Sequence, residues 1–188
     1  MDGISHSRIS SRKEGNVNNA RNRAGRIAFI GISTALALLL SYVEMLLPPI
    51  FAAVPGIKVG LPNLVIVYVL YVLGARYALA VSLTRIVLTS ILFGNAMTLA
   101  YSLAGALLSL LIMVLIKRTG WLSTVGVSVT GGVTHNLGQV LVAAVLLDTP
   151  QIAYYMIVLA FTGTVAGIII GICSSIIIER LPRDKFLF

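Results

Sequence analysis

Three hydrogen-bonding side chains interrupt an apolar stretch in the second half of the chain, VTHNLGQVLVA at residues 133–143. His135 and Gln139 are four residues apart, so in a helix they share one face, and Asn136 lies beside that face. An imidazole and two carboxamides can each donate and accept hydrogen bonds. These residues predict either a site that orients a polar ligand or a set of ties between helices.

A second group of this kind is centred on Arg85, within the apolar stretch LTRIVLTSILFGN. A charged side chain in the middle of a bilayer costs at least about 2.5–3.5 kcal/mol, so it normally faces a helix bundle or a cavity. Ser82 and Thr89 share the helix face of Arg85. The acidic residue nearest to it in depth is Glu44, close to the end of an earlier apolar stretch.

Two interpretations of these groups stay open. In the first, Arg85 pairs with Glu44, and the amides tie helices together. In the second, Arg85 and His135 receive an anionic or strongly polar ligand that the amides orient, and the loop at residues 48–60 covers the pocket. The second interpretation predicts a set of substrate-binding residues, with two asparagines at the mouth: Arg85, His135, Asn136, Gln139, Glu44, Asn63 and Asn95.

The composition indicates which elements must position these residues. Of the 188 residues, 58% are hydrophobic and 11% are charged, whereas an ordinary soluble domain is about 45–50% apolar and about 25% charged. A transmembrane helix needs roughly 20 mostly apolar residues. Six segments approach that length: 27–47, 62–74, 76–92, 98–116, 121–147 and 151–178. Because lipid cannot satisfy backbone polar groups, we predict an all-α integral membrane protein, a bundle of six transmembrane helices.

The distribution of charge predicts the orientation of that bundle. Residues 1–26 are polar and aperiodic, and we expect a basic, disordered cytoplasmic tail there, followed by one membrane domain at 27–180 and a short cytoplasmic tail at 181–188. With the N-terminus inside, the inner segments contain all Lys and Arg residues except Lys58 and Arg85. This asymmetry predicts that both termini are cytoplasmic in a multi-pass protein of the plasma membrane. The basic tail is then a positive flank of the first helix, and no nucleic-acid partner is expected.

Several kinds of catalytic site are missing from the sequence. There is no GxxxxGK[ST] motif for nucleotide hydrolysis, no GxSxG motif and no pair of carboxylates. The six acidic residues are not clustered, and a single cysteine, Cys173, cannot form an internal disulfide or a zinc site. We therefore expect a chain that is not an enzyme and that uses no metal and no cofactor.

Small residues four positions apart form two rows in the apolar segments. Gly31 and Ala35 form one row in the first segment, and Gly163, Gly167 and Gly171 form the other in the last. Small residues at this spacing let two helices approach closely. Each row therefore predicts either internal packing of the bundle or a surface that docks another membrane subunit.

The order of several motifs resembles a known membrane family. These motifs are PGIKVGLPNLVIVYVLYVLGARYAL, LTRIVLTSILFGN, YSLAGALLSLLIMVLIKR and GVSVTGGVTHNLGQVLVA. Over about residues 27 to 180 the chain resembles the family named heptaprenyl diphosphate synthase component I, also called the Gx transporter family. That family is similar to the S components of energy-coupling factor (ECF) transporters.

The resemblance implies a function. S components are six-helix subunits that capture vitamins and work with a transmembrane coupling subunit and two cytoplasmic ATPases. It also implies that Gly31 and Ala35 dock the coupling subunit, and that the loop after the first helix is a lid. The resemblance thus favours a subunit that binds a small polar or anionic solute, such as a vitamin or cofactor precursor. The alternatives are a non-catalytic membrane partner of a heptaprenyl diphosphate synthase or another isoprenoid-quinone enzyme, and a proton-coupled carrier that uses His135.

Overall fold

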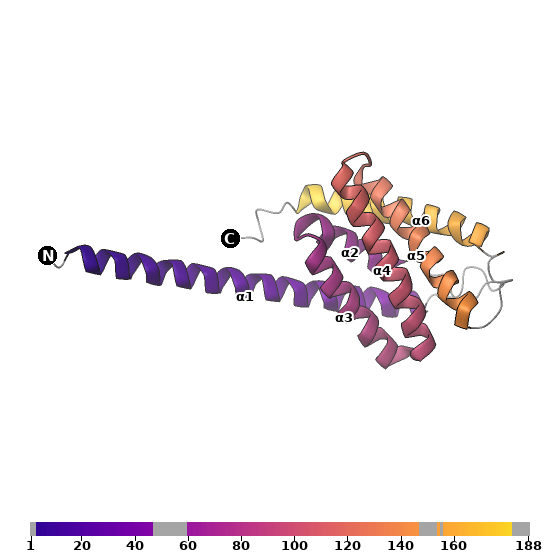
Figure 1. Cartoon of the computed structure of the whole chain (residues 1–188), viewed down its shortest axis with the longest axis horizontal. Helices are drawn as coiled ribbons and strands as arrows, with labels where there is room; N and C mark the ends of the chain where they lie inside the picture. Colours follow the sequence, from indigo (N-terminus) through magenta and orange to yellow (C-terminus); the bar gives the residue numbers. More distant parts are fainter. Residues whose placement is uncertain (1–2, 47–59, 147–153, 155, 182–188) are drawn as a thin grey trace.

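The chain folds into a bundle of helices, seen in a computed structural model that describes residues 3–46, 60–146, 154 and 156–181. The described residues form six helices (Figure 1), whose bounds are α1 Gly3–Leu46, α2 Leu61–Val72, α3 Ala75–Phe93, α4 Ala96–Thr119, α5 Thr124–Leu146 and α6 Met156–Arg180. No strand occurs among the described residues. The predicted fold class, an all-α membrane bundle, is confirmed.

Five of the helices contain a segment long and apolar enough to cross a membrane, and α2 is the exception. It has 12 residues, about 18 Å of helix, which is shorter than a hydrocarbon layer of about 30 Å. Its sequence is nevertheless the most buried in the bundle, with Val65, Val69 and Leu70 each at most 2% exposed. The other helices therefore shield α2 from the surroundings.

The helices begin and end near glycine, proline or asparagine residues. Gly60 precedes α2 with a φ of 78°, in the left-handed region, and a proline lies in the first turn of that helix. Gly120 ends α4 with a φ of 69°. Glycine adopts this conformation without the steric penalty that a Cβ atom imposes. These breaks explain why the observed helices end within a few residues of the predicted ones.

The beginning of α1 differs from the expectation of a disordered tail. The helix begins at Gly3 rather than near Ile27, and its first half extends away from the other helices (Figure 1). Residues 3–26 contain no proline, and once a helix exists, each further residue adds a hydrogen bond without a new nucleation cost. The polar segment therefore prolongs the apolar helix. Residues 182–188, most of the predicted C-terminal tail, lie outside the described part.

Glycines bring α5 into close contact with its neighbours α4 and α6. A Cβ atom on Gly132 would lie 2.6 Å from the Gly163 carbonyl oxygen of α6, and one on Gly138 would lie 2.8 Å from the Ala104 oxygen of α4. Real Cβ atoms essentially never come this close to a neighbouring atom. The small residues of α5 are thus used for helix packing, and this packing holds the polar residues of α5 in place.

The two rows of small residues have different surroundings. Gly167 and Gly171 of α6 face the α5 backbone, where added Cβ atoms would lie 2.6 Å from Val129 Cα and 2.7 Å from Val125 Cα. A Cβ atom on Gly31, by contrast, would have no atom within 4 Å. Ala35 is also exposed. The α6 row packs inside the bundle, and the α1 row lies on its outer face.

Candidate functional site

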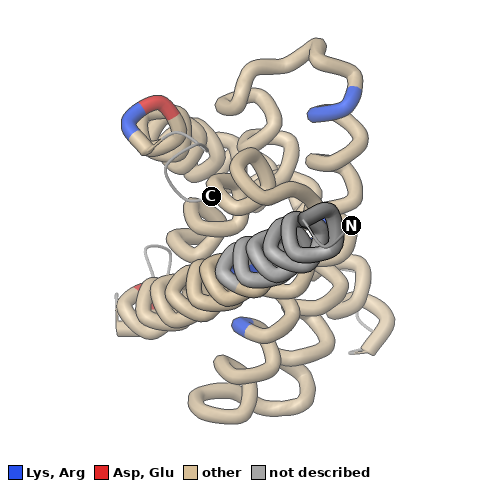
Figure 2. The backbone as a smooth tube through the Cα atoms, turned by 90° about the vertical axis from the view of Figure 1, so that its left-hand side faces the viewer, with Lys and Arg blue, Asp and Glu red and all other residues tan. Residues whose placement is uncertain are grey.

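A cavity of about 100 Å³ opens inside the bundle, and each of the six helices contributes residues to its lining. Charged residues are few in the described bundle (Figure 2). Among the residues that the structure describes, Arg85 is the only Lys or Arg that lines the cavity, and Glu44 is the only acidic residue in the lining. The described part of the lining therefore carries one formal charge of each sign.

Most of the predicted site residues meet in this cavity. The lining includes Arg85, His135, Asn136, Gln139, Glu44 and Asn63. Asn95 is not part of it. Instead, Asn95 is the N-cap of α4, where its Oδ1 accepts hydrogen bonds from the Thr98 backbone N–H at 2.9 Å and from the Thr98 hydroxyl at 3.0 Å. An N-cap asparagine satisfies a backbone donor at the start of a helix, which explains why an asparagine occupies this position.

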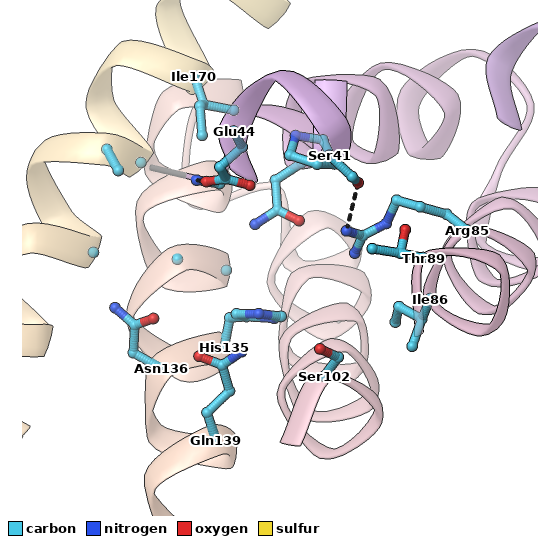
Figure 3. A pocket seen from close by; sticks show the side chains of 18 of the residues that line it. Ser41, Glu44, Arg85, Ile86, Thr89, Ser102, His135, Asn136, Gln139 and Ile170 are labelled. Atoms are coloured by element: carbon cyan, nitrogen blue, oxygen red, sulfur yellow. Dashed lines mark hydrogen bonds between the residues drawn. The ribbon is translucent and has the colours of Figure 1, made fainter. Parts of the chain in front are cut away.

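Arg85 extends from α3 toward α1 (Figure 3). Its Nη1 donates to the Ser41 hydroxyl of α1 across 3.3 Å. The Nε atom of Arg85 is buried and has no hydrogen-bond partner among the described residues. A neutral hydroxyl at this distance is a weak partner for a guanidinium, which usually forms shorter charge-assisted bonds to carboxylates or phosphates.

Glu44 lies one turn after Ser41 on α1 and binds the beginning of the next helix. Its Oε1 accepts a hydrogen bond from the backbone N–H of Gly60, the N-cap of α2. The N-terminus of a helix carries a partial positive charge that stabilises an anion. Glu44 also attracts Arg85 electrostatically. The carboxylate thus forms a hydrogen bond with the N-terminus of α2.

The polar residues of α5, which are His135, Asn136 and Gln139, both line the cavity and take part in packing against neighbouring helices. His135 and Gln139 lie on the same side of α5 (Figure 3) and pack against Gly105 of α4, where a Cβ atom would lie 2.7 Å from the His135 carbonyl oxygen and 2.9 Å from Gln139 Cγ. Asn136 Nδ2 donates to the Leu159 carbonyl oxygen of α6 across 2.7 Å. Asn136 therefore ties α5 to α6 while it also lines the cavity.

The structure adds lining residues that the sequence did not identify. Ser41, Ser102 and Thr98 supply hydroxyl groups to the cavity. Serine and threonine are frequent in these apolar helices, so their presence alone carries little information. Only the spacing of Ser41, one turn from Glu44, offered a signal. The proposed lid at 48–60 lies outside the described residues except for Gly60, which lines the cavity.

The described part of the cavity shows no group of side chains that could hold a metal ion. In the described ranges no three or more His, Cys, Asp or Glu side chains form a group that could hold one. Cys173 of α6 is a free thiol, partly buried, and it does not line the cavity. The arrangement can therefore bind a polar ligand through Arg85, amides and hydroxyls.

Comparisons with known proteins give one match. The family model described as heptaprenyl diphosphate synthase component I matches residues 33–177, from the apolar part of α1 almost to the end of α6. No curated protein matches the chain, and no solved structure does.

Proposed function

Because the chain belongs to the heptaprenyl diphosphate synthase component I family, we propose that it acts as a membrane subunit that captures a small polar or anionic solute, as the S component of an ECF-type transporter does. In this proposal both termini are cytoplasmic, and the solute enters the cavity from the outer side. A coupling membrane subunit and two cytoplasmic ATPases supply the energy.

The cavity carries this proposal. A membrane bundle gains nothing from an arginine in its interior unless another group compensates the cost of burying the charge. Arg85 of α3 lines the cavity, and His135 and Gln139 line it from α5, on the opposite side (Figure 3). An enclosed space with a few convergent polar groups is the usual form of a small-molecule site. A solute held between α3 and α5 would use all three side chains.

The outer face of α1 supports a membrane partner. Gly31 and Ala35 are exposed there, among the exposed apolar side chains of Ile32, Leu36 and Leu39. A face with small residues four apart permits close approach of a second helix. The row does no packing within the described bundle, so it is available to the coupling subunit.

Purification from native membranes under mild conditions tests the proposal. We expect the tagged chain to bring with it one further membrane protein and two ATPases. We also expect Gly31→Leu or Ala35→Leu to lower the yield of that complex, because a larger side chain holds the facing helix away. Gly25→Leu is the matched control, since Gly25 also has no atom within 4 Å of its added Cβ. Unchanged yield in both variants would remove the docking role of this face.

The description of the family favours a second candidate, a non-catalytic membrane subunit of a heptaprenyl diphosphate synthase. Prenyl synthases hold a metal–diphosphate with clustered acidic residues, and the described residues contain no such cluster. Catalysis would therefore belong to a soluble partner. The same purification separates the two candidates, because a soluble prenyl synthase would replace the ATPases among the recovered proteins.

A further inference from the structure

Two polar atoms on one face of α3 are buried without a partner. Among the described residues, neither the Arg85 Nε atom nor the Thr89 hydroxyl has a hydrogen bond. The two residues are four apart, so their side chains are neighbours on the helix, and both line the cavity. Figure 3 shows Thr89 beside the Arg85 side chain, facing the same space. A buried polar group without a partner is costly, so each such group requires an explanation.

The Thr89 hydroxyl behaves differently from other threonines in these helices. A helical threonine commonly donates to the carbonyl oxygen four residues earlier. Four threonines in the described helices do so, at distances between 2.7 and 3.2 Å: Thr34, Thr130, Thr134 and Thr164. Thr89 does not form this bond. Its hydroxyl therefore has no hydrogen-bond partner in the described bundle, at the wall of the cavity.

The charges around the cavity restrict what that group can be. Among the described residues, Arg85 is the only Lys or Arg in the lining, and Glu44 is also part of it. One positive charge can neutralise one negative charge of a ligand. A diphosphate brings at least two negative charges, so Arg85 alone cannot neutralise it, and Glu44 repels it more strongly than it repels a monoanion. A single charge with two oxygen atoms in one plane matches the edge of a guanidinium.

We infer that the cavity binds a monocarboxylate, whose two oxygens are held by the Arg85 guanidinium and the Thr89 hydroxyl. Ile86 and Phe93, which line the cavity on the same helix, supply apolar surface for the body of the ligand. This inference rests on the proposed solute-binding function and specifies its ligand class. It also means that the ligand is not the diphosphate that the family name mentions.

Binding of acids and of their amides to the purified chain tests the inference. The probes are benzoate against benzamide, hexanoate against hexanamide, and inorganic diphosphate, each followed by the thermal unfolding midpoint of the chain in detergent. We expect at least one acid to raise the midpoint at millimolar concentration, with its amide and diphosphate giving no increase. Equal effects of acid and amide, a larger effect of diphosphate, or no effect of either acid would overturn the inference.

Variants of α3 test whether the acids bind at Arg85 and Thr89. Thr89→Val should weaken acid binding roughly 2- to 12-fold, the contribution of one neutral hydrogen bond, and Arg85→Gln roughly 10- to 100-fold, that of a charge-assisted one. Thr89→Ser should restore binding. Thr84→Val is the matched control, because Thr84 is exposed on the same helix, and it should leave binding unchanged. Equal losses in Thr84→Val and Thr89→Val would contradict the assigned site.

The ligand class and the proposed function can fail separately. Recovery of a coupling subunit and ATPases with a chain that binds no acid would reject only the ligand class. Acid binding by a chain that is recovered with a soluble prenyl synthase would reject the transport function and retain the carboxylate site.

Discussion

At the scale of single residues, the balance between Arg85 and Glu44 distinguishes a binding site from a structural ion pair. Arg85 donates to the neutral Ser41, and Glu44 accepts from the Gly60 backbone. Each charged group thus has a contact of its own besides the attraction between them. Removal of one partner of a buried ion pair typically costs 3–5 kcal/mol, because the other charge is left without compensation.

We therefore expect Arg85→Met to change the free energy of unfolding by less than about 1 kcal/mol, since the charge that is lost had only a weak hydrogen bond. Thermal unfolding of the purified variant in detergent measures this. The double variant with Glu44→Gln is the control. A loss of several kcal/mol in Arg85→Met that Glu44→Gln restores would identify a structural pair and contradict our interpretation.

At the scale of elements, α5 is positioned by contacts that leave no room for a side chain. Gly132 lies against the Gly163 carbonyl oxygen of α6, and Gly138 lies against α4. The same helix carries His135 and Gln139 into the cavity. A displacement of α5 would therefore move these side chains as well.

Gly132→Ala should destabilise the bundle by about 1–3 kcal/mol, because the added Cβ would lie 2.6 Å from a backbone atom that cannot move freely. Gly31→Ala is the control on an open surface and should instead be neutral or stabilising by up to about 1 kcal/mol, since alanine is the better helix former. The thermal unfolding midpoints of both variants, compared with that of the parent chain, measure these changes in stability. If Gly132→Ala were as stable as the parent, the close packing of α5 on α6 would be wrong.

The end of α2 provides a second test at this scale. Lys117 Nζ of α4 donates to the Leu70 carbonyl oxygen across 2.6 Å and lies 4.4 Å from the centre of the Tyr71 ring. The last carbonyl groups of a helix lack partners within it, and a cation there is favourable. Lys117→Met should lower stability by about 1.5–3 kcal/mol, measured by thermal unfolding. Arg118→Met, at an exposed neighbouring position, should have no effect, and equal effects would argue against a specific tie.

At the scale of the whole molecule, we expect the charges and the aromatic residues at the helix ends to set the orientation in the membrane. Lys117 and Arg118 lie in the last turn of α4, and Trp121, 88% exposed, follows shortly after them. Tyr154, 82% exposed, precedes α6. Tryptophan and tyrosine are enriched where a membrane meets water, and Lys and Arg on the cytoplasmic side.

Labelling of cysteines at the two ends of α4 tests this orientation. The helix has 24 residues, about 36 Å, so its ends should lie on opposite sides of the membrane. In a Cys173→Ala background, we expect a membrane-impermeant thiol reagent added from outside to label Ala96→Cys and to miss Thr119→Cys until the membrane is permeabilised. The reverse pattern would show that the termini are not cytoplasmic.

The sequence by itself determined the class of the molecule and the contents of its helices. The excess of apolar residues, their division into six segments and the polar residues within those segments predict six helices with a polar interior, because a helix satisfies its backbone hydrogen bonds without help from lipid. The period of the helix also showed that His135 and Gln139 share a face.

Only the tertiary structure decided which way each face points and what it meets. The rows at Gly31 and Gly163 have the same spacing, yet one lies on the surface and the other packs on α5. Asn63 and Asn95 both precede or begin a helix, yet only Asn63 lines the cavity. Helical periodicity specifies which residues are neighbours within one helix, whereas the rotation of each helix and its partners depend on contacts between segments distant in the sequence. The contacts of Arg85 with Ser41 and of Glu44 with Gly60 are of that second kind.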